Sequence, residues 1–430
     1  MKVGIIGGGF TGLACATVLA ESGCEVVLYE KNPKLGGLAA GFKELTWTSH
    51  LESYYHHWFK TDRAVSRFAE IWGASDGLYF KRPSTVFQTE RHGFVPLDSA
   101  ASLLRYPELN LTSKVRMGLG LSYLKLTKNW QKLEKISAVD WCTRYLGVEG
   151  FEAIWKPLLQ GKFGVRYAAE INMAWLWARL HCRTPELGTY MGGFDAFVDR
   201  AERFLLGKGV RIFKDARDLR LDSLREGWTV AALNHGIQEH DAVVIAASPS
   251  AFAALASAHA PEHVRATLGQ PALGVQVVVL SLNQPLGNHY WYSLKRSNAQ
   301  PFLAAIEHTN FVDPSYFGGE HLIYFAKYVD VKSEEWNETD EQLLELALMG
   351  CPLINSKFSR GHLIRGRVFR NEYAQPVVGL NASRNVPSIH VHGVPRLFHG
   401  SLAHVYPWDR GTNYALELGE KIAQAILKSA

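Results

Sequence analysis

Residues 1–30, MKVGIIGGGFTGLACATVLAESGCEVVLYE, contain the pattern that decides the fold. Val3–Ile6 is a short apolar run, which is typical of a buried parallel strand. Leu13–Glu21 has the composition of a helix that Gly23 would end, and Glu25–Glu30 predicts a second buried strand that ends on an acid. The stretch therefore predicts a strand, a helix and a second strand joined by short connections.

The loop between the first strand and the helix has the spacing GxGxxG, with Gly7, Gly9 and Gly12 at its glycine positions. In a dinucleotide-binding loop the first glycine makes a tight turn and the second lets the backbone approach a pyrophosphate. The third glycine lets the helix pack close to the strand, and the helix N-terminus presents free N–H groups to the phosphates. We expect the whole loop, including Phe10 and Thr11, to contact a bound dinucleotide.

An acid and a glycine doublet follow the second strand. Glu30 lies about twenty residues beyond the glycine loop, where an acid accepts hydrogen bonds from ribose hydroxyls. Lys31 follows Glu30 directly, and the doublet Gly36 and Gly37 comes a few residues later, before Leu38. We expect all five residues to lie beside the bound nucleotide.

Residues 1–41 resemble the opening of the large FAD-dependent family that includes monoamine oxidases, protoporphyrinogen oxidase, phytoene desaturases and UDP-galactopyranose mutase. The resemblance implies that FAD is the cofactor and that Gly36 and Gly37 pack beside its pyrophosphate. Family members often have Arg after this doublet, whereas this chain has Leu38. One cationic phosphate contact is therefore missing or supplied from elsewhere.

Two middle segments resemble later parts of the same family. Tyr190–Leu206 has a glycine doublet and helical spacing, and in the family this leads into a strand beside the adenine, here Val210–Phe213. Asp241–Pro249 resembles the buried strand beneath the nucleotide. Leu219, just beyond the first strand, and Ala247, small enough to admit the cofactor, are candidate FAD contacts.

The C-terminal segment resembles the end of the family fold. Ser388–His392 predicts a strand and Ala415–Leu427 predicts a final helix. The resemblance implies that this helix N-terminus faces the flavin ring, where backbone N–H groups stabilise negative charge. The candidate FAD contacts there are Asp409, Gly411, Thr412 and Asn413.

FAD is expected to bind non-covalently. No cysteine follows Cys351, so a cysteinyl linkage near the ring has no candidate. His399 and His404 lie near the expected ring and leave a histidyl linkage as the less favoured alternative.

These segments predict an α/β protein with a discontinuous Rossmann-like FAD-binding domain and a mixed α+β substrate domain. The FAD-binding domain is expected to comprise residues 1–80, 190–270 and 386–430. The substrate domain is expected to comprise residues 81–189, mainly helical and rich in aromatics, and 271–385.

The segment Glu52–Trp58, ESYYHHW, supplies His56 and His57 as candidate catalytic residues. The resemblance places it at the flavin face, where a His could act as a base or orient substrate, because its pKa lies near neutrality. Amine oxidase relatives often carry a Lys on the strand resembling Gly274–Leu282, where it holds a water at the flavin. This chain has Gln276 there and no Lys, so amine oxidation with rapid reoxidation by oxygen is disfavoured.

The resemblance implies an FAD-dependent oxidoreductase that removes a hydride from an organic substrate, which could be an amine, an alkene or isoprenoid, a porphyrinogen or a saccharide-linked compound. Two alternatives stay open. A non-redox nucleotide-sugar mutase would be favoured by arginines lining the cavity, and Arg179, Arg183 and Arg367 are candidates. A flavin-binding protein without turnover would reduce normally and respond to no substrate.

Composition adds a few constraints. The formal net charge of +5 is mild, and we expect a small-molecule substrate and no nucleic-acid partner. Lys114–Lys135 is a basic amphipathic stretch that could rest on an anionic membrane and reach a lipid-linked substrate, although a solvated helix face is more common. No apolar run is long enough to span a membrane, and the cysteines show no CxxC or metal spacing. We therefore expect a cytoplasmic protein without a metal site.

Overall fold

The computed structural model describes residues 1–429. Its central element is a five-stranded parallel sheet in the order β10-β2-β1-β14-β20. In chain order these strands are β1 (Lys2–Ile6), β2 (Glu25–Tyr29), β10 (Arg211–Phe213), β14 (Ala242–Ile245) and β20 (Leu397–His399). The start, middle and end of the chain meet in this one sheet, and the fold is α/β.

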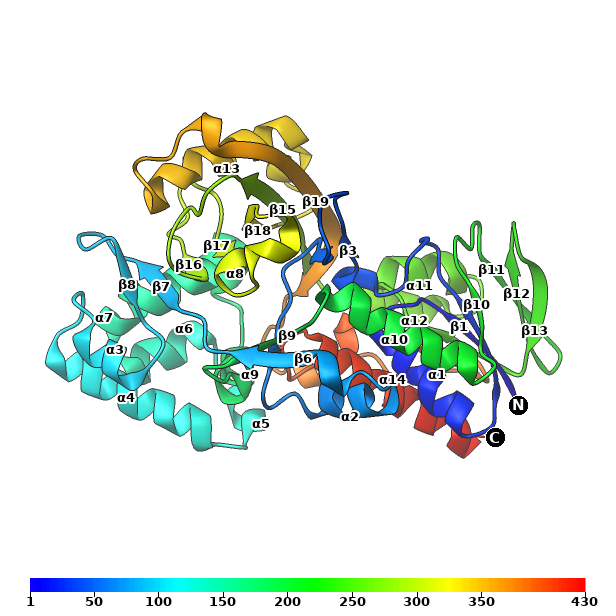
Figure 1. Cartoon of the computed structure of the whole chain (residues 1–430). Helices are drawn as coiled ribbons and strands as arrows, with labels where there is room; N and C mark the ends of the chain where they lie inside the picture. The colour runs from blue at the N-terminus through cyan, green and yellow to red at the C-terminus, as the bar shows by residue number, and fades with distance from the viewer. Residues whose placement is uncertain (430) are drawn as a thin grey trace.

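Helices cover both faces of the parallel sheet (Figure 1). One face packs against α1 (Phe10–Glu21), α2 (Arg63–Ile71), α10 (Gly193–Gly207) and α14 (Thr412–Ser429). The other face packs against α11 (Pro249–Ala256), α12 (Pro261–Leu268) and an antiparallel sheet of β11 (Arg220–Leu224), β12 (Gly227–Ala232) and β13 (Gly236–His240). Burial on both faces explains why β1 and β14 are almost continuously apolar.

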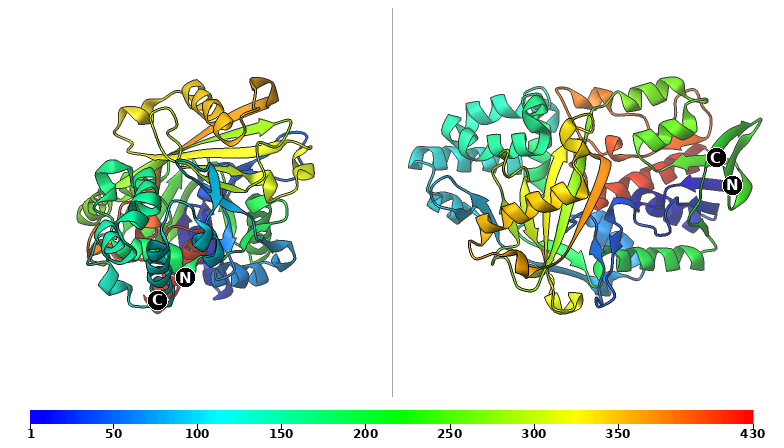
Figure 2. Two further views of the ribbon diagram at one scale, coloured as in Figure 1. Left: turned by 90° about the vertical axis from the view of Figure 1, so that its left-hand side faces the viewer. Right: turned by 90° about the horizontal axis from the view of Figure 1, so that it is seen from above.

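A second, seven-stranded sheet has the order β19-β15-β18-β17-β16-β7-β8. Its strands are β7 (Thr85–Gln88), β8 (Phe94–Pro96), β15 (Ala272–Leu282), β16 (Trp291–Ser293), β17 (Ala304–Glu307), β18 (His321–Val329) and β19 (Leu363–Pro376). One face is covered by α13 (Asp340–Ile354), and the other packs against a helical region (Figures 1 and 2). This region contains α3 (Ala100–Arg105), α4 (Leu111–Leu126), α5 (Trp130–Leu133), α6 (Ala138–Trp141), α7 (Val148–Gly150), α8 (Lys156–Ala168) and α9 (Met173–Cys182).

Two small antiparallel sheets join the large units. They pair β3 (Gly41–Phe42) with β4 (Leu51–Glu52), and β9 (Leu187–Tyr190) with both β5 (Trp58–Phe59) and β6 (Leu78–Lys81). The chain therefore returns from the helical region through β9, directly into α10, which packs on the five-stranded parallel sheet.

One expectation from the sequence is wrong. Ser388–His392 is not the closing strand, since His390 makes only an isolated bridge to Phe398 and β20 takes the place beside β14. His390 is exposed whereas Leu397 and Phe398 are buried, so apolar burial selects the later run. The stretch before the helical region also contains β7 and β8, which extend the seven-stranded sheet.

Candidate functional site

The glycine loop between β1 and α1 is closed to side chains. Gly7 has φ +112°, its N–H donates to the Tyr29 carbonyl at 2.8 Å, and a Cβ there would lie 2.3 Å from the Ala246 carbonyl oxygen. A Cβ on Gly12 would lie 1.9 Å from the Gly7 carbonyl oxygen. Only glycine therefore allows α1 to pack this closely on β1.

The N-terminus of α1 has no side-chain cap and no acid in its first turn, so its N–H groups stay available to an anion. Phe10 points into the core, where its ring stacks on Phe197 with centroids 6.1 Å apart. Thr11 lies where α1 crosses α14, because a Cβ on Gly419 would lie 2.2 Å from the Thr11 carbonyl oxygen. Phe10 and Thr11 can therefore contact a nucleotide through their backbone atoms. Phe10 also packs against α10, and Thr11 packs against α14.

The glycine doublet lies against this loop. Gly36 forms a parallel bridge with Gly9, and its N–H donates to the Gly8 carbonyl at 2.8 Å. Gly36 and Gly37 have φ +110° and +60°, and a Cβ on Gly37 would lie 3.2 Å from the Gly9 Cα. Leu38, the next residue, is half-buried. The structure thus brings the two glycine motifs together into one backbone cradle.

Glu30 is held at the end of β2 beside the cradle. Its Oε2 accepts from the Gly8 N–H at 2.7 Å, and its Oε1 accepts from the N–H and Nδ2 of Asn32, both at 2.9 Å. A carboxylate offers about four lone-pair directions, so positions remain for ribose hydroxyls. Lys31 is exposed, and the role of Asn32 was not foreseen from the sequence.

Leu219 and Ala247 lie on the α11 face of the parallel sheet. Both are half-buried and pack against the core that contains Phe252 and Val264. The loop preceding Leu219 is tied to the end of β2, because the Ala216 N–H donates to the Glu30 carbonyl at 2.9 Å. This connection places the loop next to the acid that would hold a ribose.

The N-terminus of α14 is anchored by its first side chains. Thr412 Oγ1 accepts from Trp58 Nε1 at 2.6 Å, and Asn413 Oδ1 accepts from the Ala64 N–H at 2.9 Å. Asn413 therefore caps α2, and its Nδ2 donates to Glu417. With both side chains occupied, contacts from Thr412 and Asn413 to a cofactor would come from the backbone, as they would from Gly411.

His56 and His57 lie close to this helix start, since the neighbouring Trp58 bonds Thr412. The Nδ1 of His56 is 2.5 Å from the Tyr54 carbonyl oxygen, and the Nδ1 of His57 is buried without a partner among residues 1–429. Burial lowers the pKa of His56 to about 4 and, with Arg183 nearby, lowers the pKa of His57 to about 3. Both rings are neutral at pH 7 but only weakly basic, which suits substrate orientation better than proton abstraction.

Three basic side chains from different parts of the chain meet in front of α14. The sequence did not single them out as a group. We call Lys162, Arg179 and Arg410 the cationic cluster. Lys162 Nζ lies 3.5 Å from Asp409 Oδ2, and Arg179 lies 2.5 Å from the same oxygen. Asp409 is therefore committed to these cations and to Trp175, whose Nε1 donates to Oδ1 at 3.2 Å.

Two aromatic rings complete the cationic cluster. Lys162 lies 5.1 Å from the centroid of Trp175 and 5.4 Å from that of Tyr328. Arg179 stacks over Trp175 at 5.2 Å and Arg410 over Tyr328 at 4.7 Å. Each ring thus carries two cations, and Lys162 is 3% exposed.

Burial governs the pKa values in this cluster. Burial, and then Arg179, lower the pKa of Lys162 well below its usual range, while Asp409 opposes the shift. Burial alone would raise the pKa of Asp409, but Lys162 and Arg179 together hold it below its usual value. Burial lowers the pKa of Arg410 to about 10, so this guanidinium stays charged at neutral pH.

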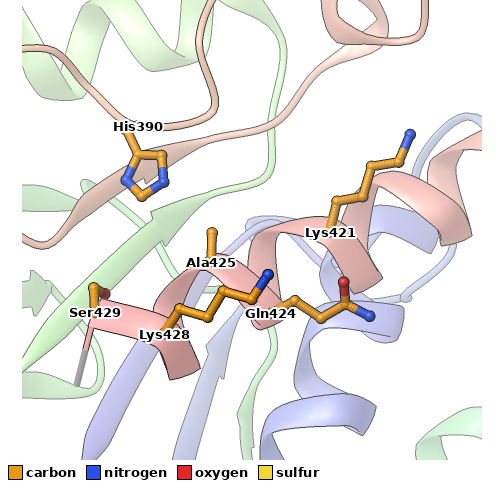
Figure 3. Close-up of a pocket in the computed structure, with 6 residues that line it drawn as sticks. All are labelled: His390, Lys421, Gln424, Ala425, Lys428 and Ser429. Atoms are coloured by element: carbon orange, nitrogen blue, oxygen red, sulfur yellow. The ribbon is translucent and has the colours of Figure 1, made fainter.

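A cavity of about 680 Å³ lies beside the cluster. Its wall includes Trp175, Trp408, Asp409 and Arg410, together with the end of β19 and residues 382–388. A smaller hollow of about 380 Å³ is lined by His390 and the last turns of α14 (Figure 3). Its nearest helix residue, Lys421, is about 14 Å along α14 from Thr412 at 1.5 Å per residue, so this hollow is separate from the site.

Gln276 points away from the aromatic helical region. Its side chain lies on the α13 side of β15 and donates to the Trp336 carbonyl at 3.1 Å. The residues of β15 that face the aromatic helical region are Val275, Val277 and Val279. Lys162 from α8 instead places its Nζ over Trp175 and Tyr328.

The three arginines proposed from the sequence do not form one group. Arg179 belongs to the cationic cluster and Arg183 is exposed at the end of α9. Arg367 is paired with Glu44, with its Nε 2.6 Å from Oε1, and lies over Phe42.

Comparisons with known proteins identify a matching family model and solved structures with a similar fold. The family model described as flavin containing amine oxidoreductase matches residues 10–350. The chain is 31% identical over 163 residues to a carotenoid phi-ring synthase from Streptomyces griseus, a match that covers 33% of this chain and 31% of that protein. The curated relatives are matched over about a third of their length.

Two solved structures share the fold. Reduced UDP-galactopyranose mutase superimposes with a TM-score of 0.76 at 15% identity, covering 100% of this chain and 96% of that one. Cyclohexylamine oxidase from Brevibacterium oxydans superimposes with a TM-score of 0.73 at 14% identity, covering 99% and 98%. Identities this low show the fold alone. Among residues 1–429, no helix is both long and apolar enough to cross a bilayer.

Proposed function

The chain belongs to the family of flavin-containing amine oxidoreductases, and on that premise we propose that it binds FAD non-covalently and removes a hydride from an organic substrate. The carrying observation is the cavity of about 680 Å³ that opens beside the turn leading into α14. FAD supplies the hydride-accepting chemistry when bound. The chain itself binds the dinucleotide, orients the substrate and excludes water.

The proposed cofactor contacts follow the backbone cradle. Its glycines and the α1 N-terminus fit the pyrophosphate of FAD, since a Cβ would fill the space at Gly7, Gly12 or Gly37. Glu30 fits a ribose, and the α14 N-terminus fits the ring end of the cofactor. The remaining proposed contacts are Gly9, Phe10, Thr11, Lys31, Gly36, Leu38, Leu219, Ala247, Asp409, Gly411, Thr412 and Asn413.

His56 and His57 are proposed to orient the substrate through hydrogen bonds as neutral imidazoles. This role follows from their place beside the α14 N-terminus and from the low pKa values that enclosure imposes. Replacing His57 with Gln should then raise KM for the substrate more than it lowers kcat.

The test of the proposed function is the absorption spectrum of the purified protein. Blue and near-ultraviolet bands that acid precipitation releases to the supernatant would support non-covalent flavin, and anaerobic bleaching by one substrate class would identify the hydride donor. A protein that takes up no FAD would contradict the proposal. Flavin that dithionite reduces but no substrate bleaches would favour a flavin-binding protein without turnover.

A non-redox flavin-dependent mutase is the second candidate. The cationic cluster favours it, because Arg410 lines the cavity, Arg179 lies behind Trp175 in its wall, and guanidinium groups suit the diphosphate of a nucleotide sugar. Turnover of a nucleotide sugar that requires prior dithionite reduction, with no net oxidation of substrate, would select this candidate over the oxidoreductase.

We also propose peripheral contact with an anionic membrane through α4. One face of this helix exposes Leu111, Val115, Leu119, Tyr123 and Leu126, each 51–79% exposed. These residues recur at helical spacing, and α4 contains basic residues and no acid. A lipid-linked substrate would then reach the cavity from the membrane surface. A cytoplasmic location fits the five free cysteines of the described chain.

A further inference from the structure

We propose that the cationic cluster binds an anionic group of the substrate, either a phosphate or a carboxylate. This proposal rests on the proposed function, because it assigns the substrate class of the same cavity. It is independent of whether the bound flavin acts in hydride removal or in the mutase reaction.

The first argument is the charge count. Lys162 and Arg179 share a single carboxylate, that of Asp409, within the described chain, while Arg410 lies over Tyr328 and donates to the Ala374 carbonyl at 2.8 Å. The other titratable group beside Arg410 is Tyr55, which burial keeps protonated by raising its pKa. Arg179 and Arg410 alone bring two positive charges against the one carboxylate of Asp409, so positive charge is in excess whatever the protonation state of Lys162. Buried charges are retained when a partner compensates them, so an anion is the missing partner.

The second argument is the unused hydrogen-bonding capacity of Lys162. The Nζ of Lys162 carries at least two N–H donors in either protonation state, and it meets one carboxylate oxygen at 3.5 Å and the faces of Trp175 and Tyr328. Neither ring accepts a strong hydrogen bond. A phosphate or carboxylate oxygen would satisfy donors that the folded chain leaves open.

The third argument is position. Asp409, Arg410 and Trp175 line the cavity of about 680 Å³, and Arg410 precedes the first residue of α14 by two positions. An anionic group on the cluster would thus hold the rest of a substrate beside the helix that fits the flavin ring. The same positive charge repels a protonated amine, which argues against the amine class as substrate.

The pyrophosphate of FAD does not account for the cluster. It fits the glycine loop at the N-terminus of α1, where Gly7, Gly12 and Gly37 leave the space. Lys162 and Arg179 come from α8 and α9. Both make ion pairs with Asp409 and cation–π contacts with Trp175, rather than contacts with that loop.

The test uses the FAD-loaded protein and the visible spectrum of its flavin. Inorganic pyrophosphate, succinate and benzylammonium are titrated separately, and ultrafiltration checks that no flavin is released. We expect pyrophosphate or succinate to perturb the spectrum and raise Tm, and benzylammonium to do neither. The better of the two anions distinguishes a phosphate-bearing from a carboxylate-bearing substrate.

Three variants sharpen the test. Lys162→Met should weaken binding of the preferred anion at least tenfold, whereas Asp409→Asn should tighten it, because the only opposing carboxylate is removed. The control Lys421→Met, an exposed lysine far along α14, should leave the anion affinity unchanged. Opposite effects of Lys162→Met and Asp409→Asn are not expected from a merely structural role.

The proposal is overturned if neither anion perturbs the flavin, if benzylammonium binds more tightly, or if Lys162→Met changes the flavin reduction potential while leaving anion affinity intact. These outcomes are distinct from failure of the proposed function. A protein that retains FAD and is reduced by dithionite but ignores anions contradicts the anion site alone. A protein that takes up no FAD contradicts the proposed function itself.

Discussion

At the scale of single residues, Gly12 shows how a missing side chain defines the cofactor cradle. Replacing Gly12 with Ala would place a Cβ 1.9 Å from the Gly7 carbonyl oxygen, a backbone atom that cannot rotate away. We expect Gly12→Ala to lower FAD retention at least tenfold and to destabilise the fold by about 1–3 kcal/mol, as overpacking does. Flavin content after gel filtration and Tm measure the two effects.

Gly118→Ala is the matched control for Gly12→Ala. A Cβ on Gly118, within α4, would meet nothing within 4 Å, and Ala favours a helix interior over Gly. Gly118→Ala should therefore keep its flavin and should not lower Tm. Equal flavin content in the two variants would remove the geometric argument for the cradle.

Glu52 is a buried carboxyl at the residue scale that should make stability depend on pH. Its Oε1 accepts from the Phe194 N–H at 2.8 Å, yet burial raises its pKa from 4.5 to about 7. Below pH 4.5 the Glu52 carboxyl is neutral in both the folded and the unfolded state. As pH rises through 7, the folded state must hold a buried negative charge, which costs stability. That cost corresponds to about 3 kcal/mol.

Glu52→Gln removes this ionisation while keeping an oxygen for Phe194. Relative to the parent protein, the variant should match or fall below it in stability at pH 5 and gain on it as pH rises to 8. Tm measured across this range tests the sign. Glu70→Gln, on the exposed side of α2, should show no such crossover. A Tm difference between Glu52→Gln and the parent that does not change with pH would refute the assignment.

At the scale of elements, α4 carries an apolar face that no other part of the described chain covers. Leu111→Ser, Leu119→Ser and Leu126→Ser together should reduce binding to phosphatidylglycerol-containing vesicles at least tenfold, because each exposed leucine contributes about 1.5–3 kcal/mol when fully buried. Co-sedimentation at low salt measures the binding. The folded core should be unaffected, since these side chains are exposed.

Leu233→Ser and Ile237→Ser provide the control for the α4 variant. Both residues are similarly exposed but lie on the hairpin of β12 and β13, away from α4. They should leave vesicle binding unchanged. If the α4 variant instead changes the mass in solution while vesicle binding persists, the apolar face serves self-association.

At the scale of the whole molecule, three distant parts of the chain should share one cofactor. The glycine loop, the end of β14 and the N-terminus of α14 surround the proposed FAD site. A ligand that binds only the folded state stabilises it by about 2.7 kcal/mol at a hundredfold excess over Kd. Added FAD should therefore raise Tm in calorimetry, and Gly12→Ala should abolish the rise. Unfolding that ignores FAD would mean that these segments do not form one site.

The nucleotide-binding unit could be predicted from the sequence because its information is local. Gly7, Gly9 and Gly12 act through backbone space within one strand-helix unit, and Glu30 ends the next strand of the same sheet. Such patterns depend on glycine geometry and strand burial, which short stretches of sequence encode directly. The resemblance to the flavin family could be stated on these residues for the same reason.

Side-chain direction could not be predicted in the same way. β15 is apolar at nearly every position, so its sequence does not say which alternate residues face the helical region, and only the structure places Gln276 on the α13 side. Asn413 likewise has the residue type of a cofactor contact, but the approach of α2 makes it a helix cap.

The sequence by itself determined that this chain builds a glycine-rich nucleotide cradle at its start, since that motif is read within one short segment. Only the tertiary structure decided what faces the cavity. Lys162 and Arg179 come from two helices, Tyr328 from the large sheet, and Asp409 and Arg410 from the turn before α14. Folding brings these side chains together out of water, and their charges interact strongly for that reason. Their spacing along the chain does not reveal that they meet.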